Sequence, residues 1–163
     1  MRDIGRMVIE RVAPQELVIF HPESRAYFKD PQAALEAARK RASAKPKDRE
    51  AGYGAAELMD VLTPFALAVA GAVVEPLVVR IAQSATLRTR EAAQTAVRRL
   101  FRREQPAGTE EQDGIVPIVL SAEERSRLWQ QAYQEGLGQG LDDTKARRLA
   151  DGLIDGLDEQ PGT

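Results

Sequence analysis

Hydrophobic residues recur at intervals of three and four along most of the chain, the spacing that gathers side chains on one face of an α-helix. In residues 3–13, Ile4, Met7, Val8 and Val12 follow this spacing and predict a short amphipathic helix. Similar patterns return further along the chain, so we expect an all-α fold.

Prolines predict where the next helices begin and end. Pro14 suits the first turn of a second short helix. We expect His21-Pro22 to end that helix, because the residue before a proline is pushed out of the α region. Asp30-Pro31 predicts the start of a third helix, since Asp30 can act as the N-cap acceptor and Pro31 fits the first helical position.

The most apolar stretch, VLTPFALAVAGAVV, covers residues 61–74 and contains no charged side chain. Thr63 and Pro64 suit the cap and first turn of a helix, whereas Glu75-Pro76 is expected to kink or break it. A helix that is apolar on every face is one that is surrounded, by protein or by lipid.

The length of this apolar helix is compatible with a protein core and with a membrane. Its 14 uncharged residues span roughly 21 Å, whereas a bilayer core is about 30 Å thick and runs of this length are more often buried core helices. Extension to residues 61–79 gives roughly 28 Å, but it brings Glu75 near one end. The residues expected in the protein core, or in the membrane, are Phe65, Leu67, Val69, Val73 and Val74.

A long basic helix is predicted over residues 77–103. Ala93, Val97, Leu100 and Phe101 form its apolar stripe. Its basic surface is formed by Arg88, Arg90, Arg98, Arg99, Arg102 and Arg103.

Two further helices are predicted to form a C-terminal αα-hairpin. Ser121 and Glu124 have the spacing of a capping box at the start of the first helix, and Asp142 or Asp143 can cap the second. The packing faces contain Leu128, Trp129, Ala132, Tyr133 and Leu137 in the first helix, and Leu149, Ala150, Leu153, Ile154 and Leu157 in the second.

The pattern GLxxGL occurs twice in this hairpin, at residues 136–141 and 152–157. Glycines four residues apart allow another backbone to approach closely. We interpret these glycines as helix ends and as sites of close packing within the hairpin.

Two polar segments are predicted to be linkers, one charged and one acidic. The expected order is therefore short helices in residues 1–42, a linker in 43–54, the apolar and basic helices in 55–103, a second linker in 104–114, the tethered hairpin in 115–158 and a tail in 159–163.

The net charge of −2 conceals a segregation of charge. Residues 80–103 contain seven arginines and one glutamate, whereas residues 104–163 contain 13 acidic and five basic side chains. Blocks of opposite charge can pair within the molecule, or each can bind an outside partner.

No arrangement of residues predicts chemistry. The chain has no cysteine, and its single histidine, His21, has no neighbouring ligands at a metal-binding spacing. Acidic pairs such as Glu123/Glu124 and Asp142/Asp143 stand at helix starts, where water solvates them and the helix dipole favours them. We therefore expect no catalytic, metal or cofactor site.

The leading hypothesis is a cytoplasmic, non-enzymatic interaction or assembly protein. The apolar helix would form a core or self-association surface, and the acidic hairpin would bind a protein partner. Trp129 and Tyr133 are the expected contact residues, unless they close the hairpin's own core. The other residues assigned to the interaction are Val97, Leu100, Phe101, Leu149 and Leu153.

Two alternative hypotheses use the same segments differently. In the first, residues 61–79 insert into a membrane and the arginine-rich helix lies on anionic head groups. In the second, the arginines bind nucleic acid. Their spread around the helix and the lack of interleaved aromatic residues argue against that second alternative.

Overall fold

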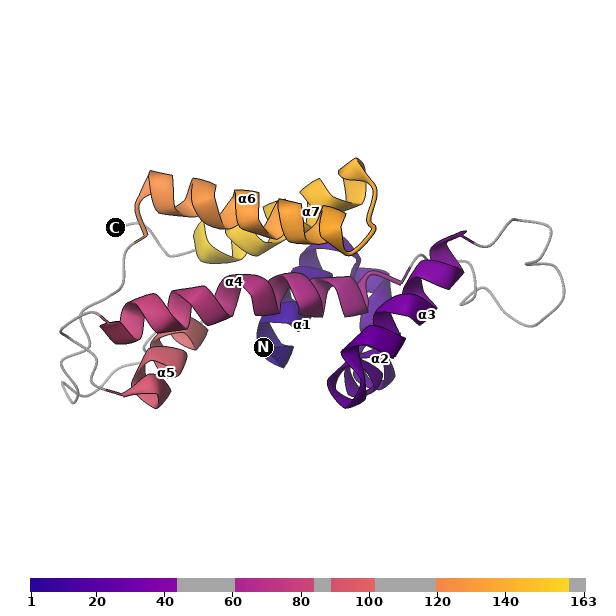
Figure 1. Cartoon of the computed structure of the whole chain (residues 1–163), viewed down its shortest axis with the longest axis horizontal. Helices are drawn as coiled ribbons and strands as arrows, with labels where there is room; N and C mark the ends of the chain where they lie inside the picture. The colour runs from indigo at the N-terminus through magenta and orange to yellow at the C-terminus, as the bar shows by residue number, and fades with distance from the viewer. Residues whose placement is uncertain (44–60, 84–88, 102–119, 159–163) are drawn as a thin grey trace, which may run out of the picture.

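The computed structural model describes residues 1–43, 61–83, 89–101 and 120–158, which form an all-α fold and confirm the predicted class. The elements are α1 (Arg2–Val12), the 3₁₀ turn η1 (Pro14–Glu16), α2 (Leu17–Lys29), α3 (Pro31–Ser43), α4 (Thr63–Gln83), α5 (Arg90–Phe101), α6 (Ala122–Gly138) and α7 (Asp143–Asp158). Helix α4 runs through the centre, with α6 along it, α5 near one end and α2 and α3 near the other (Figure 1).

Helix α1 is amphipathic, as expected, and packs against both α4 and α7. Ile4, Val8 and Ile9 are buried on its inner face. Gly5 allows α4 to come close, because a Cβ atom at this position would lie 2.5 Å from Leu67 Cδ2. The N-terminal helix therefore contributes directly to the core around α4.

The prediction that His21-Pro22 ends a helix is wrong, because α2 continues to Lys29 with Pro22 inside it. Pro22 has no N–H to donate to the carbonyl of Val18. Val18 is 85% exposed, so water can solvate that carbonyl instead. The expected start of the following helix is confirmed, since the Ala33 N–H donates to Asp30 Oδ1 at 3.0 Å.

A kink or a break was predicted at Glu75-Pro76, and the break does not occur, because α4 continues to Gln83. Pro76 cannot donate to the carbonyl of Ala72, four residues earlier. Gln131 on α6 replaces the missing donor, with its Nε2 atom 2.6 Å from that carbonyl oxygen. A contact from a distant helix thus keeps α4 continuous.

The long helix predicted over residues 77–103 is divided in the structure. Residues 77–83 are the last turns of α4, because Leu77, Val78 and Ile81 continue its buried face. Residues 90–101 form α5, a separate helix that packs against α4.

The first turn of α4 is held by a fully buried carboxylate, Glu16. Its two oxygens accept hydrogen bonds from the backbone N–H of Leu62 at 2.8 and 2.9 Å. Glu16 Oε2 also accepts from the backbone N–H and the hydroxyl of Thr63, at 2.9 and 2.8 Å. Glu16 thereby satisfies donors that a helix start leaves without intrahelical partners.

The C-terminal hairpin begins with the expected capping box of Ser121 and Glu124. Asp142 caps the second helix by accepting from the Lys145 N–H at 2.9 Å. Between the helices, Gly140 has φ of +90°, a left-handed conformation that glycine adopts without strain.

The hairpin shares one core with the rest of the molecule, since α6 packs on α4 and α7 packs on α1. Gly136 packs within the hairpin, as expected, because a Cβ there would lie 3.1 Å from Ala146 Cβ. Gly152 and Gly156 instead face α1, where added Cβ atoms would lie 2.5 and 2.3 Å from Val12 Cγ2 and Met7 Cε. The hairpin is thus docked on the central helices.

The predicted linkers at 43–54 and 104–114 lie outside the described residues except at Ser43, and so do residues 115–119 at the start of the predicted hairpin segment. The tail at 159–163 lies outside them as well.

Candidate docking surface

Helix α4 is buried along its first half and open along one side of its second half. Every residue from Thr63 to Ala70 is buried. Gly71 and Ala72 are half-buried, and Glu75, Pro76 and Val79 are exposed. These last five residues recur at helical spacing and form one continuous strip, which we call the α4 stripe.

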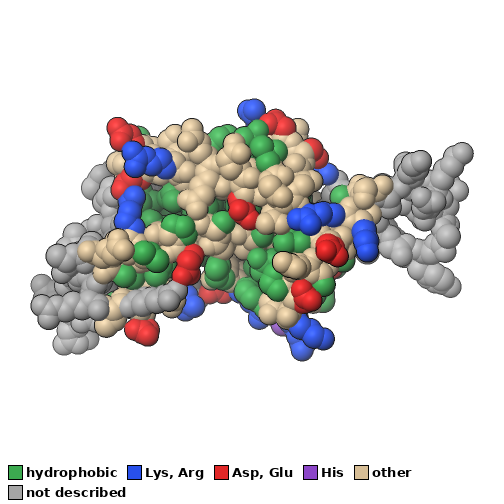
Figure 2. Space-filling view, viewed as in Figure 1, with side chains coloured by type: hydrophobic (Ala, Val, Ile, Leu, Met, Phe, Trp, Pro, Cys, Tyr) green, Lys and Arg blue, Asp and Glu red, His purple; other side chains and the backbone are tan. Residues whose placement is uncertain are grey.

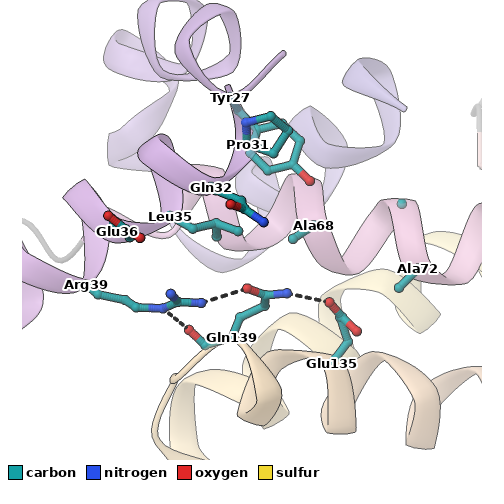
Figure 3. Close-up of a pocket in the computed structure, with 11 residues that line it drawn as sticks. Tyr27, Pro31, Gln32, Leu35, Glu36, Arg39, Ala68, Ala72, Glu135 and Gln139 are labelled. Carbon is teal, nitrogen blue, oxygen red and sulfur yellow. Dashed lines mark hydrogen bonds between the residues drawn. The ribbon is translucent and has the colours of Figure 1, made fainter. Parts of the chain in front are cut away.

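A pocket of about 670 Å³ lies at one end of the α4 stripe. Ala68, Gly71 and Ala72 of α4 line it, together with residues of α2, α3 and the end of α6. Tyr27 and Gln32 point toward α4 at Ala68 (Figure 3). From the same side as Figure 1, hydrophobic side chains reach the surface in the middle of the molecule, among scattered acidic and basic ones (Figure 2).

A chain of hydrogen bonds crosses the pocket from α3 to α6 (Figure 3). Arg39 donates from Nε to the Gln139 carbonyl at 2.6 Å and from Nη2 to Gln139 Oε1 at 2.9 Å. Gln139 Nε2 in turn donates to Glu135 Oε1 at 2.7 Å. Residues 100 positions apart in the sequence are therefore joined at this site.

The charged residues that line the pocket are two carboxylates and one guanidinium, Arg39. Glu36 lies on α3 and Glu135 on α6. Burial raises the pKa of the Tyr27 hydroxyl, and the negative charge of Glu135 raises it further. The arrangement offers hydrogen-bond donors, acceptors, two negative charges and one positive charge around an apolar floor, which suits recognition of another molecule.

Five residues assigned to the interaction by sequence are buried in the protein's own core. Each is no more than 8% exposed, and they are Val97, Leu100 and Phe101 on α5 and Leu149 and Leu153 on α7. They stabilise the fold in this conformation and present no surface to a partner.

Trp129 and Tyr133 are half-buried and link the two helices of the hairpin. Their rings stack with centroids 5.2 Å apart. Trp129 Nε1 donates to Asp151 at 2.7 Å, and the Tyr133 hydroxyl donates to Asp143 at 2.6 Å. The hydrogen bonds from Tyr133 and from Arg147 lower the pKa of Asp143. Both aromatic residues thus close the hairpin, one of the two roles expected of them.

The residues expected inside protein or lipid are enclosed by protein in this structure. None is more than 8% exposed, and they are Phe65, Leu67, Val69, Val73 and Val74. Among the described residues, α4 is the one helix long and apolar enough to cross a bilayer, with a mean hydropathy of 1.9, yet 61% of that stretch is buried inside the molecule. Such burial is also typical of a core helix.

Most of the predicted basic surface falls outside the described part of the chain. Arg88, Arg102 and Arg103 lie in segments that are not described, and the side chains of Arg90 and Arg99 are not described either. Arg98 is exposed on α5. Its charge contributes, after burial, to lowering the pKa of the Met1 amino group.

In the described ranges, no three His, Asp or Glu side chains gather closely enough to hold a metal ion. His21 is exposed on α2. Glu124 accepts from the Ser121 backbone, which lowers its pKa, and Asp142 likewise accepts from Lys145. One member of each acidic pair at these helix starts, Glu124 or Asp142, therefore takes part in capping.

Sequence patterns did not reveal the pocket or its hydrogen-bonded bridge. Arg39 and Gln139 are far apart in the chain, and the GLxxGL pattern around Gln139 does not indicate a contact with Arg39. The one available signal was Pro76, which leaves the Ala72 carbonyl without its usual donor and so indicates a contact from another element. That signal does not identify Gln131 as the donor.

No known protein family, curated protein or solved structure matches the chain.

Proposed function

We propose that this protein is a non-enzymatic helical interaction module that binds a protein partner along the α4 stripe, between α3 and α6. The observation that carries the proposal is the one-sided opening of α4. Its apolar first half is enclosed, whereas the side from Gly71 to Val79 is open and leads into a pocket with polar walls. Grooves of this kind accept an added helix or peptide.

In this proposal the acidic hairpin contributes to the docking surface, through residues other than Trp129 and Tyr133. Glu135 and Gln139 form one wall of the pocket, whereas Trp129 and Tyr133 hold the hairpin together. The proposed docking site therefore combines the end of α6 with the stripe of α4.

Site-specific photo-crosslinking tests the proposal, because a chain without cysteine accepts a single engineered thiol. Val79→Cys places a crosslinker on the α4 stripe, and Val18→Cys places one on exposed α2 as the matched control. We expect discrete adducts from position 79 only. An adduct of twice the chain mass from purified protein would identify a second copy of the chain as the partner.

Competition provides the second readout. Excess unlabelled wild-type chain should suppress the position 79 adduct, whereas Ala72→Arg should not, because its long side chain fills the stripe while its charged end reaches water. Identical adducts from both labelled positions, or none from position 79, would contradict the proposal.

Membrane association remains an alternative that requires α4 to leave its protein contacts. The length and hydropathy of α4 are compatible with this alternative. Extraction of cell membranes with alkaline carbonate separates the two proposals. A docking module enters the supernatant, and an inserted α4 stays in the pellet.

A further inference from the structure

Small residues form the floor of the docking surface. Gly71 and Ala72 stand three and four residues after Ala68 on α4. Small side chains at this spacing let the backbone of a second helix approach closely. A Cβ atom added at Gly71 would lie 3.2 Å from Met1 Cε, at the flexible end of that side chain. Apart from the Met1 side chain, no atom would lie within 4 Å of it.

The open stretch of α4 has the length of a short helix. From Gly71 to Val79 the helix rises by roughly 12 Å, about two turns. Val79 is 44% exposed and provides an apolar contact at the end away from the pocket. A partner helix of about two turns therefore fits this surface.

The charged side chains at this surface differ in the partners that they contact. Arg39 donates to neutral oxygens of Gln139, and Arg80, at the other end of α4, forms an ion pair with Glu124. Glu36 is exposed, and Glu135 accepts only from a neutral amide. Within the described residues no Lys or Arg pairs with either of these two carboxylates.

We infer that the partner segment is a basic amphipathic helix, a refinement that depends on the docking function proposed above. Its apolar face lies on the small residues of α4, and its Lys or Arg side chains lie between Glu36 and Glu135. The partner supplies positive charge to a pocket whose two carboxylates, Glu36 and Glu135, outnumber the single guanidinium of Arg39, which favours encounter and fixes orientation.

A phage-displayed library of helical peptides, panned against the full chain, tests this inference. Ala72→Arg serves for counter-selection, so that retained peptides are those that need the α4 stripe. We expect enrichment of peptides with apolar residues three and four apart and with flanking Lys or Arg. Their affinity should fall as salt concentration rises.

Isosteric variants then isolate the charge. Glu36→Gln with Glu135→Gln should weaken binding of a selected peptide roughly tenfold, because two partly exposed charge pairs are lost. Glu123→Gln with Asp155→Asn removes the same charge from surface positions outside the pocket, and it should leave the affinity unchanged.

The outcomes separate the inference from the function on which it depends. Selected peptides that lack basic residues, or that bind the Glu36→Gln, Glu135→Gln double variant as tightly as wild type, would overturn the basic partner and leave docking intact. A library that yields no peptide sensitive to Ala72→Arg would overturn both.

Discussion

At Pro76, α4 lacks one backbone donor, and a single glutamine supplies it. Gln131 reaches from α6 to the Ala72 carbonyl at 2.6 Å. Because this carbonyl is the one that Pro76 leaves without a partner, the contact is specific to the proline. The helix that carries the α4 stripe therefore depends on the hairpin for its continuity.

A double-mutant cycle tests this coupling. Gln131→Leu should lower the free energy of unfolding by about 0.5–1.5 kcal/mol, because the carbonyl loses its donor. In a Pro76→Ala background the restored N–H should make the same substitution markedly less costly. Urea denaturation measures all four proteins. An equal cost in both backgrounds would show that Gln131 does not compensate for the proline.

Glu16 is a second residue whose role depends on distant backbone, since it holds the start of α4 from a position 46 residues earlier. Burial raises the pKa of Glu16 above its ordinary 4.5, although the hydrogen bonds from Leu62 and Thr63 oppose this shift. The folded state therefore retains the Glu16 proton to higher pH than the unfolded chain does.

The sign of the pH dependence follows from that shift. Because the pKa is raised in the folded state, the stabilising contribution of Glu16 is fully present below pH 4.5. It is lost as the pH rises through the pKa of the folded state. The difference in unfolding free energy between wild type and Glu16→Gln should therefore shrink as the pH rises from 4.5 to neutrality. Urea titrations at several pH values measure it. A difference that grows with pH would contradict the expected direction.

At the scale of elements, α7 and α1 pack closely because glycine leaves room. Gly152→Ala would place a Cβ 2.5 Å from the β-branched side chain of Val12. We expect a loss of about 1–2 kcal/mol, as overpacking outweighs the gain in helix propensity. Gly138→Ala is the matched control, because nothing lies within 4 Å of its added Cβ. Equal thermal stabilities of both variants would refute the close approach of the two helices.

Helix starts were predictable because their chemistry is local. Asp30, Ser121 and Asp142 each bond a backbone N–H three residues later, and this spacing is visible in the sequence. The helix ends expected at Pro22 and at Pro76 were predicted wrongly. One freed carbonyl belongs to exposed Val18, where water can reach it, and a side chain of another helix bonds the other. Local pattern establishes an element, whereas tertiary contacts decide where it ends.

At the scale of the whole molecule, the apolar segment was the most informative part of the sequence. Its 14 uncharged residues predicted an enclosed helix, and residues 63–70 are all buried. The open side from Gly71 onward could not be predicted, because it depends on how α3 and α6 pack around α4. The bridge between Arg39 and Gln139 depends on the same packing.

Thiol reactivity along α4 tests the central claim that this helix is enclosed by protein and open on one side only. Single cysteines at Ala70 and Val73 replace fully buried residues, whereas cysteines at Ala72 and Val79 lie on the α4 stripe. The account predicts rapid labelling at 72 and 79, and labelling at 70 and 73 only as fast as the protein unfolds. Rapid labelling at all four positions of the folded protein would contradict it.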